Sequence, residues 1–287
     1  LPRLIEQADL IVVHRAAANR SLERALHSAR QRGALVLADT ADLVFDPLAF
    51  PYINNPEFMD PVRTRLYLEE MLRHRRTLEL CAGALVSTDF LAGEVEKLGI
   101  PARVHRNAAS LEMWESSRKP EQKPASADQR FVIGYASGSP THNQDFALIH
   151  PALQDFLRDH PQAELRLIGY LDLDASWKSF AGRIRHEPLR PWRQLPAWLG
   201  ELDLNLAPLE ADNPFSRSKS EIKWLEAALV SVPTIASRTP AFEHAIHPEE
   251  NGWLAASPQE WLAALEQALA PDLRGRFATQ AYRDACF

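Results

Sequence analysis

Three charged residues in the second half of the chain have the types and spacing to bind a phosphorylated ligand. Lys219, Lys223 and Glu226 lie three to four residues apart, so on a helix they share one flank. Ammonium groups and free amides at a helix N-terminus suit a phosphate, and one turn further the Glu226 carboxylate can accept hydrogen bonds from a sugar diol. A capped surface helix with a Lys223–Glu226 ion pair explains the same spacing equally well. Hydroxyl groups cluster just before this flank, at Ser216, Ser218 and Ser220.

The elements around this flank predict a parallel α/β sheet. Apolar residues recur at helical spacing from Glu221 to Leu229, and a β-branched run at Val232 to Ala236 predicts a buried strand. The start of the chain alternates in the same way, with strands at Asp9 to His14 and Ala34 to Ala38 around a helix. Strands that alternate with helices favour a parallel sheet covered on both faces.

Ligands of such sheets bind beyond the carboxyl ends of the strands. His14, Arg15 and Asp39 follow the first two strands and are expected to project there. Three carboxylates in this region, Asp39, Asp42 and Asp46, raise the possibility of a hard-cation site. Helix and turn capping is the more common use of Asp, so a capped loop is the competing explanation of these carboxylates.

A second strand, turn and helix follow at Phe131 to about Asp159. Gly138 lets the backbone approach a ligand, and Thr141 with Gln144 predicts a capping box at the helix start. The turn is a second candidate anion cradle. The residues of this turn that could contact a ligand are Ser137, Gly138, Thr141 and His142; helix capping is the competing role for His142.

Two stretches resemble the GT-B glycosyltransferases of family 4. EIKWLEAALVSVPTIAS is similar to their nucleotide-binding segment, and GYASGSPTHNQDF resembles the strand and glycine turn that open their second domain. In that family two glutamates are separated by seven residues, and the second holds the donor ribose. Glu226 matches the second glutamate, whereas Ser218 stands at the first. Lys223 matches a lysine that relatives place near the diphosphate.

The resemblance implies two Rossmann-like domains facing a cleft. We expect an N-terminal acceptor-side domain at residues 1–111, a linker at 112–130 and a nucleotide-sugar-binding domain at 131–287. The first strand and glycine-rich loop of the family are not found, so the N-terminal domain is expected to be incomplete, in a shortened variant or a piece of a longer multidomain polypeptide.

The resemblance also implies a retaining transferase that moves a sugar from a nucleotide-sugar donor to a glycan, lipid-linked or polysaccharide-precursor acceptor. Such a transferase is expected to need no cofactor and no bound metal, and either Asp39 or Asp42 is expected to orient an acceptor hydroxyl. Charge on the departing diphosphate is then stabilised mainly by cations and helix N-termini. The expected catalytic residues are Lys219, Lys223, Arg15 and Asp39, and the expected donor-binding residues are Ser137, Gly138, Thr141, His142, Trp192, Ser218 and Glu226, with Trp192 framing the base.

Composition limits the remaining classes of function. The 32 basic and 38 acidic residues give a net charge of −6, which disfavours nucleic acid as a partner. Cys81 and Cys286 have neither metal-ligand spacing nor a disulfide framework, and no run spans a bilayer, so we expect a cytoplasmic protein. An arginine-rich helix at Pro61 to Leu80 allows peripheral contact with an anionic membrane, although its interleaved glutamates favour a solvated face.

Two other functions stay open. A GT-B epimerase would act on the same nucleotide sugars without an acceptor. A non-catalytic glycosyltransferase-like module within a larger assembly is favoured by the shortened start and by Ser218 in place of glutamate. P-loop hydrolysis, zinc chemistry and serine-hydrolase chemistry lack their motifs.

Overall fold

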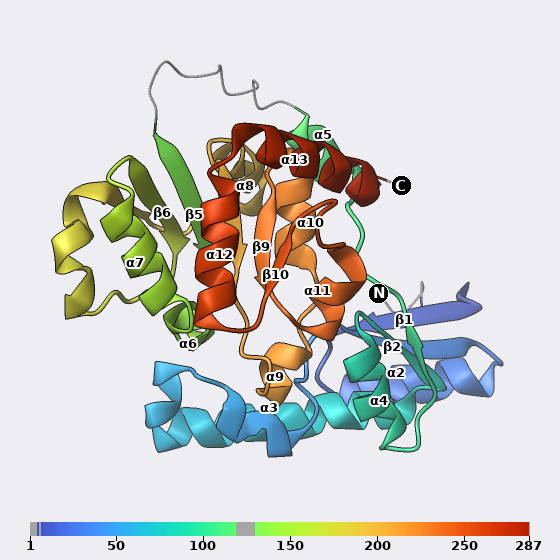
Figure 1. Cartoon of the computed structure of the whole chain (residues 1–287). Coiled ribbons are helices and arrows are strands. Elements are labelled where there is room, and N and C mark those ends of the chain that lie inside the picture. Colours follow the sequence, from blue (N-terminus) through green and yellow to red (C-terminus); the bar gives the residue numbers. More distant parts are fainter. Residues whose placement is uncertain (1–4, 6, 119–129, 287) are drawn as a thin grey trace. The chain divides into compact units, whose positions relative to one another are not determined.

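The computed structural model describes residues 5, 7–118 and 130–286, which divide into two compact units (Figure 1). Unit 1 comprises Leu1–Asn107 and Asp212–Ser220, and unit 2 comprises Ala108–Ala211 and Glu221–Phe287. The chain therefore leaves unit 2 once, contributes a short segment to unit 1 and returns. The sequence predicted one boundary between the units, at the linker 112–130, and did not predict that residues 212–220 return to unit 1.

Unit 1 is an α/β unit with one return helix from late in the chain. Its elements are β1 (Leu10–His14), α2 (Arg20–Gln31), β2 (Leu35–Thr40), η1 (Pro47–Tyr52), η2 (Pro56–Met59), α3 (Pro61–Leu80), β3 (Gly83–Val86), α4 (Asp89–Glu96), β4 (Ala102–Val104) and α9 (Pro214–Arg217).

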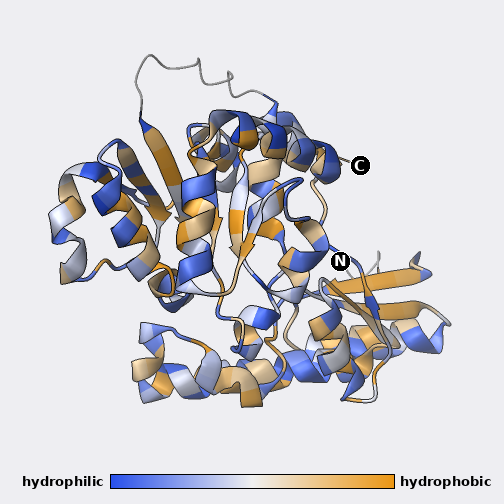
Figure 2. Cartoon of the chain, in the orientation of Figure 1, coloured by the Kyte–Doolittle hydropathy of each residue, from blue (hydrophilic) through white to orange (hydrophobic). Residues whose placement is uncertain are grey.

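The described part of unit 1 holds a four-stranded parallel sheet in the order β1-β2-β3-β4. His14 and Asp39 are register partners, so both lie at the carboxyl ends of neighbouring strands, as predicted. The expectation that the sheet is covered on both faces is wrong for β1 and the start of β2. Leu10, Val12 and Leu35 are 55%, 46% and 48% exposed, and both strands are largely orange in Figure 2.

Unit 2 contains most of the second half of the chain. Its elements are α5 (Leu111–Ser117), β5 (Phe131–Ser137), η3 (Pro140–His142), α6 (Asn143–Ala147), α7 (His150–Asp159), β6 (Ala163–Gly169), η4 (Ala175–Arg183), β7 (Ile184–Glu187), η5 (Trp192–Gln194), α8 (Leu195–Leu199), β8 (Leu204–Ala207), α10 (Ile222–Ala228), β9 (Thr234–Ser237), α11 (Pro240–Ala245), β10 (Trp253–Ala255), α12 (Pro258–Ala268) and α13 (Pro271–Cys286).

The sheet of unit 2, as far as the chain is described, has six parallel strands in the order β10-β9-β8-β5-β6-β7. Successive residues of β5 enter different cores: Ile133 and Tyr135 pack with α7 and α12, whereas Val132 packs with Trp198 of α8. Both faces of this sheet are thus apolar and covered, which is the burial expected of a parallel sheet.

Two local predictions are corrected. The stretch 112–130 was expected to be a linker, but α5 begins after the N-cap residue Ser110 and covers the start of this stretch. Met113 and Trp114 of α5 pack against a core cluster of unit 2. Residues 119–129 of the expected linker lie outside the described residues.

The capping box predicted at Thr141 is also wrong. The Thr141 hydroxyl hydrogen-bonds to Ser139 Oγ at 2.6 Å, and neither η3 nor α6 has a side-chain cap.

The return segment Asp212–Ser220 is built into unit 1 by packing and by hydrogen bonds. Phe215 is 8% exposed and belongs to the apolar core of that unit. Asn213 caps α9 and donates from Nδ2 to the Tyr52 carbonyl at 3.0 Å. Burial of an aromatic side chain of this size contributes on the order of 2–3 kcal/mol, so the segment is an integral part of the unit.

Candidate functional site

The N-terminal half of α10 lies against the end of β5 within unit 2. The Lys223 ammonium donates to the Ala136 carbonyl and lies 4.9 Å from the centre of the Tyr135 ring. The apolar spacing that predicted the helix places Trp224, Leu225 and other residues in the core and leaves Lys223 on the opposite flank. Lys223 therefore meets the strand that leads into the predicted donor-binding turn.

Glu226 is half-buried on the same helix. Among the described residues it accepts no hydrogen bond, and burial raises the pKa of its carboxyl, with the nearby Lys223 ammonium opposing that rise. Partial burial disfavours the ionised carboxylate, and hydrogen bonds donated by a ligand would offset that cost. The arrangement suits a diol, because two hydroxyl groups can donate to the two carboxylate oxygens.

The turn after β5 contains both occupied and open groups. Ser137 is 1% exposed, and its hydroxyl lies 2.5 Å from the Tyr170 carbonyl, so that oxygen serves the fold. Gly138 differs, because a Cβ built on it would meet no atom within 4 Å. At Gly134 a Cβ would lie 2.2 Å from Leu202. Packing explains the glycine at 134, whereas the space above Gly138 is open to a ligand.

His142 is held in one orientation by a carboxylate that the sequence reasoning did not identify. Its Nδ1 lies 2.9 Å from Asp145 Oδ2, and Asp145 Oδ1 accepts from the Glu210 amide at 3.0 Å. Asp145 is 3% exposed. The signal was available as the three-residue spacing of a helical His–Asp pair. His142 is thus a positioned side chain rather than a mobile surface histidine.

Trp192 begins η5 and is 42% exposed. The guanidinium of Arg193 lies 4.7 Å from the centre of its ring and is itself paired with Glu112 at 2.5 Å. Trp192 thus presents an exposed aromatic face beside a cation, and its role in framing a base stays a prediction.

In unit 1, two predicted cations, Arg15 and Lys219, contact the carboxylate of Asp42. Asp42 Oδ2 lies 2.7 Å from an Arg15 guanidinium nitrogen, and Asp42 Oδ1 lies 2.9 Å from Lys219 Nζ. Lys219 also lies 4.4 Å from the centre of the Phe215 ring. Arg15 has a positive φ of 42°, a conformation that costs a non-glycine residue on the order of 1 kcal/mol or more.

The other two unit 1 predictions have different surroundings. Asp39 Oδ2 pairs with His14 Nδ1 at 2.7 Å, and both side chains are accessible. Ser218 is completely buried: its hydroxyl donates to the Phe215 carbonyl at 2.7 Å and accepts from the Leu43 amide at 3.3 Å. These bonds fix the return segment, so the geometry gives Ser218 a structural role. Ser218 and Lys219 belong to unit 1, whereas Lys223 and Glu226 belong to unit 2.

Helix α3 supplies further titratable groups to the unit 1 cluster. Burial raises the pKa of Tyr67, and the Asp42 carboxylate adds to the rise. Burial lowers the pKa of His74, with Glu70 opposing that shift. A cavity of about 10 Å³ lies beside Arg15, Asp39 and His74, which is room for a single water.

The described residues contain no group of three or more His, Cys, Asp or Glu side chains that could hold a metal ion. Asp42 faces two cations, and Asp46 accepts from the Leu48 amide at 3.1 Å as the cap of η1. No described helix has the length and apolar content that crossing a bilayer requires.

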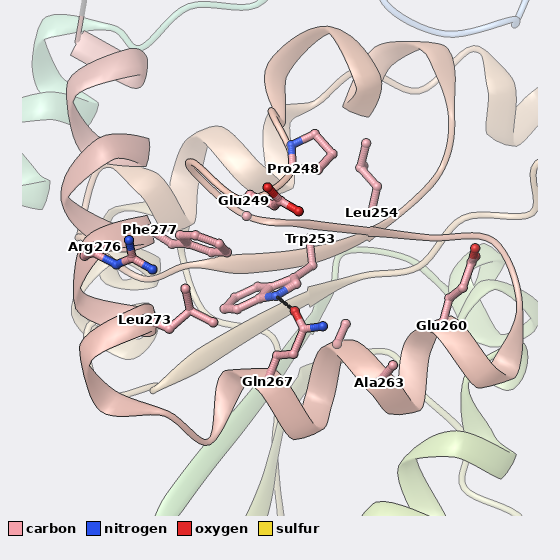
Figure 3. Close-up of a pocket in the computed structure, with 12 residues that line it drawn as sticks. Pro248, Glu249, Trp253, Leu254, Glu260, Ala263, Gln267, Leu273, Arg276 and Phe277 are labelled. Atoms are coloured by element: carbon pink, nitrogen blue, oxygen red, sulfur yellow. Dashed lines mark hydrogen bonds between the residues drawn. The ribbon is translucent and has the colours of Figure 1, made fainter.

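A separate groove of about 550 Å³ lies on unit 2 between β10, α12 and α13 (Figure 3). Trp253 lies between Phe277, Leu273 and Gln267, and its indole nitrogen donates to Gln267 Oε1 at 2.9 Å. Arg276 also lines this groove. None of the residues predicted from the sequence lines this groove.

The fold is shared with solved glycosyltransferase structures of GT-B type. HepE of Anabaena, solved with UDP and glucose, has a TM-score of 0.61 at 17% identity, over 99% of this chain and 74% of that one. Sucrose-phosphate synthase of Thermosynechococcus elongatus has a TM-score of 0.62 at 16% identity, over 100% of this chain and 73% of that one. TarM of S. aureus has a TM-score of 0.64 at 10% identity, over 99% of this chain and 53% of TarM, so the chain spans about half of TarM. The chain is a GT-B protein, as predicted.

The family assignment rests on a stretch of sequence that lies mostly in unit 2. Residues 130–271 match the family model described as "Glycosyl transferases group 1", which confirms the assignment as a glycosyltransferase. Membership of family 4 stays a prediction. No curated protein sequence matches the chain significantly. The matched residues include α10 with Lys223 and Glu226, and the turn from Ser137 to His142. Residues 130–271 are therefore a group 1 glycosyltransferase segment within a chain of GT-B fold.

Proposed function

We propose that this chain is a retaining family 4 transferase that moves a sugar from a nucleotide-sugar donor to a glycan, lipid-linked or polysaccharide-precursor acceptor. The observation that carries the proposal is the half-buried Glu226 carboxylate on α10, which accepts no hydrogen bond from the described residues and lies near Lys223. A ribose diol would supply the missing donors. The group 1 match over residues 130–271 supports the same use of this helix.

In the proposed reaction, Lys223 lies near the donor diphosphate, and Gly138, Thr141 and His142 contact the phosphates or sugar. Trp192 frames the base. The bond between the anomeric carbon and the diphosphate breaks, a bond to the acceptor oxygen forms on the same face, and the proton of the acceptor hydroxyl leaves with the diphosphate. Lys219 and Arg15 stabilise the negative charge of the leaving diphosphate, and Asp39 orients the acceptor hydroxyl. The proposal includes no metal and no further cofactor.

Product analysis tests this proposal. The protein is incubated with UDP-, GDP-, dTDP- and ADP-sugars and a panel of glycan acceptors, and transferred sugar is detected by mass spectrometry. Proton NMR of the product then gives the anomeric configuration. Transfer with retention is expected, and it should fall at least tenfold in Lys219→Met. An altered sugar without transfer would instead identify an epimerase.

The non-catalytic alternative has one specific observation in its favour. Ser218 stands where the family has its first glutamate, and its hydroxyl is consumed by bonds within unit 1. Nucleotide binding without hydrolysis or transfer, across all donors and acceptors, would establish this alternative.

We further propose a cytoplasmic location and a peripheral membrane contact through α3. Val62, Leu66 and Leu72 are 64%, 53% and 53% exposed on this arginine-rich helix. Ion pairs such as Arg63–Glu57 and Arg65–Glu69 reduce its net charge, so the expected contact is weak. Flotation with vesicles containing 30% anionic lipid tests it, and equal flotation of Leu66→Glu and wild type would contradict it.

A further inference from the structure

One carboxylate in unit 1 lies between the two cations to which the proposed function assigns the diphosphate charge. Asp42 contacts Arg15 with one oxygen at 2.7 Å and Lys219 with the other at 2.9 Å. We propose that Asp42 is an internal competitor for phosphate, which neutralises part of the charge of Arg15 and Lys219 and so weakens the binding of a diphosphate to them. The inference rests on the proposed function for the identity of the anion.

The backbone holds the Asp42 carboxylate in place. The Asp42 carbonyl accepts from Thr40 Oγ1 at 3.0 Å and from the Val44 amide at 2.9 Å. The Asp42 side chain is 16% exposed. Asp42 therefore lies on a turn that is held by hydrogen bonds, and each of its carboxylate oxygens contacts one cation. This geometry distinguishes it from an isolated ion pair on the surface.

The two cations are also held. Lys219 follows the buried Ser218 and lies over Phe215, a core residue of unit 1. Arg15 follows β1 with its positive φ, and its amide donates to the Asp39 carbonyl at 3.0 Å. Their side chains are 44% and 24% exposed for Arg15 and Lys219 respectively, so an anion can reach both from solvent.

The charges decide the direction of the effect. Arg15, Lys219 and an ionised Asp42 carry a net charge of +1, whereas the two cations alone carry +2. A pyrophosphate that approaches them is therefore attracted less strongly while Asp42 is ionised, and it is also repelled by that carboxylate at close range. Removal of the carboxylate charge should tighten pyrophosphate binding roughly tenfold.

Calorimetric titration of the full chain with inorganic pyrophosphate tests the inference. Asp42→Asn should bind about tenfold more tightly than wild type, while Lys219→Met and Arg15→Met should bind more weakly. Glu70→Gln is the matched control, because it removes an acidic charge that acts on Tyr67 and His74, whereas Arg15 and Lys219 pair with Asp42. Its affinity should stay within about twofold of wild type.

A merely structural role for Asp42 would lower affinity on substitution. Weaker or unchanged binding in Asp42→Asn, or no pyrophosphate binding by wild type and variant alike, would overturn the inference. Asp42→Ser provides a second neutral variant if the first does not fold. Stabilisation of wild type by a nucleotide sugar, measured separately, decides the proposed function, which can hold even if Asp42→Asn leaves pyrophosphate affinity unchanged.

Discussion

The charged groups of the two units differ in how far the protein itself satisfies them. In unit 1, Asp42 carries an ion pair on each oxygen, and Asp39 is paired with His14. In unit 2, Glu226 is half-buried and accepts no hydrogen bond from the described residues. Perturbed, unsatisfied groups are common at binding sites, since folding alone gives no reason to keep them. The comparison makes Glu226 on α10 the carboxylate whose binding of a ligand we test first.

The comparison also extends to how each site is held. Unit 2 presents Lys223 and Glu226 on one continuous helix, packed by its own core. Unit 1 assembles Arg15, Asp42 and Lys219 from both halves of the chain, and it depends on the return segment to do so. Loss of that segment's packing should therefore affect unit 1 far more than unit 2.

The largest expected effect comes from Phe215→Ala. It should destabilise unit 1 by about 3 kcal/mol, because the substitution leaves a cavity in the core of that unit. Hydrogen exchange should show faster opening of β1 to β4 and little change in β5 to β10. Leu111→Ala, at a side chain that is 69% exposed, is the control. Equal loss of protection in both units would contradict the division.

Lys223→Met should weaken nucleoside diphosphate binding by roughly thirtyfold, about 2 kcal/mol, because it removes a cation that also bonds the end of β5. Calorimetry with the nucleotide that stabilises wild type measures this change. Lys178→Met, elsewhere on unit 2, should leave the affinity unchanged. Comparable losses in the two variants would indicate a general charge effect.

Ser218→Ala should cost about 1–2 kcal/mol, since the Leu43 amide loses its buried acceptor. Urea unfolding monitored on unit 1 measures the loss. The same variant should keep wild-type affinity for nucleotide, because the hydroxyl is occupied within the protein. A large affinity loss with unchanged stability would restore Ser218 as a ligand contact.

The smallest expected effect is a difference in pH dependence. Folding raises the pKa of Glu226 above its ordinary value of 4.5, so the folded state holds the proton more strongly than the unfolded state. The free energy of unfolding contributed by this group therefore falls as pH rises from 4.5 through the raised pKa. Glu226→Gln should lack this fall, and its stability relative to wild type should increase with pH across that window.

His74 in unit 1 should show the opposite sign. Its pKa is lowered by burial, so its contribution to stability is lost as pH falls below 6.5 through the lowered pKa. The difference in the free energy of unfolding between wild type and His74→Gln, followed by urea unfolding at several pH values, measures this contribution. Parallel pH trends for the Glu226 and His74 variants would contradict the contrast between the units.

Much of unit 2 was predictable from the sequence because its signals are local. The apolar spacing from Glu221 to Leu229 predicted α10, and strands alternating with helices predicted parallel sheets. The contacts of Asp42 were not predictable, since Lys219 lies 177 residues away and reaches it only through the return segment. Helix α5 was missed because its short sequence lacks periodicity, and tertiary packing of Met113 and Trp114 supports it.

The most direct test of the central claim is thermal stabilisation by UDP-, GDP-, dTDP- and ADP-sugars, measured in parallel on wild type and Glu226→Gln. We expect one nucleotide class to raise the melting temperature of wild type by several degrees and to leave the variant unchanged. Equal stabilisation of both proteins would show that Glu226 does not bind the ribose. No stabilisation of wild type by any donor would contradict the proposed nucleotide-sugar site itself.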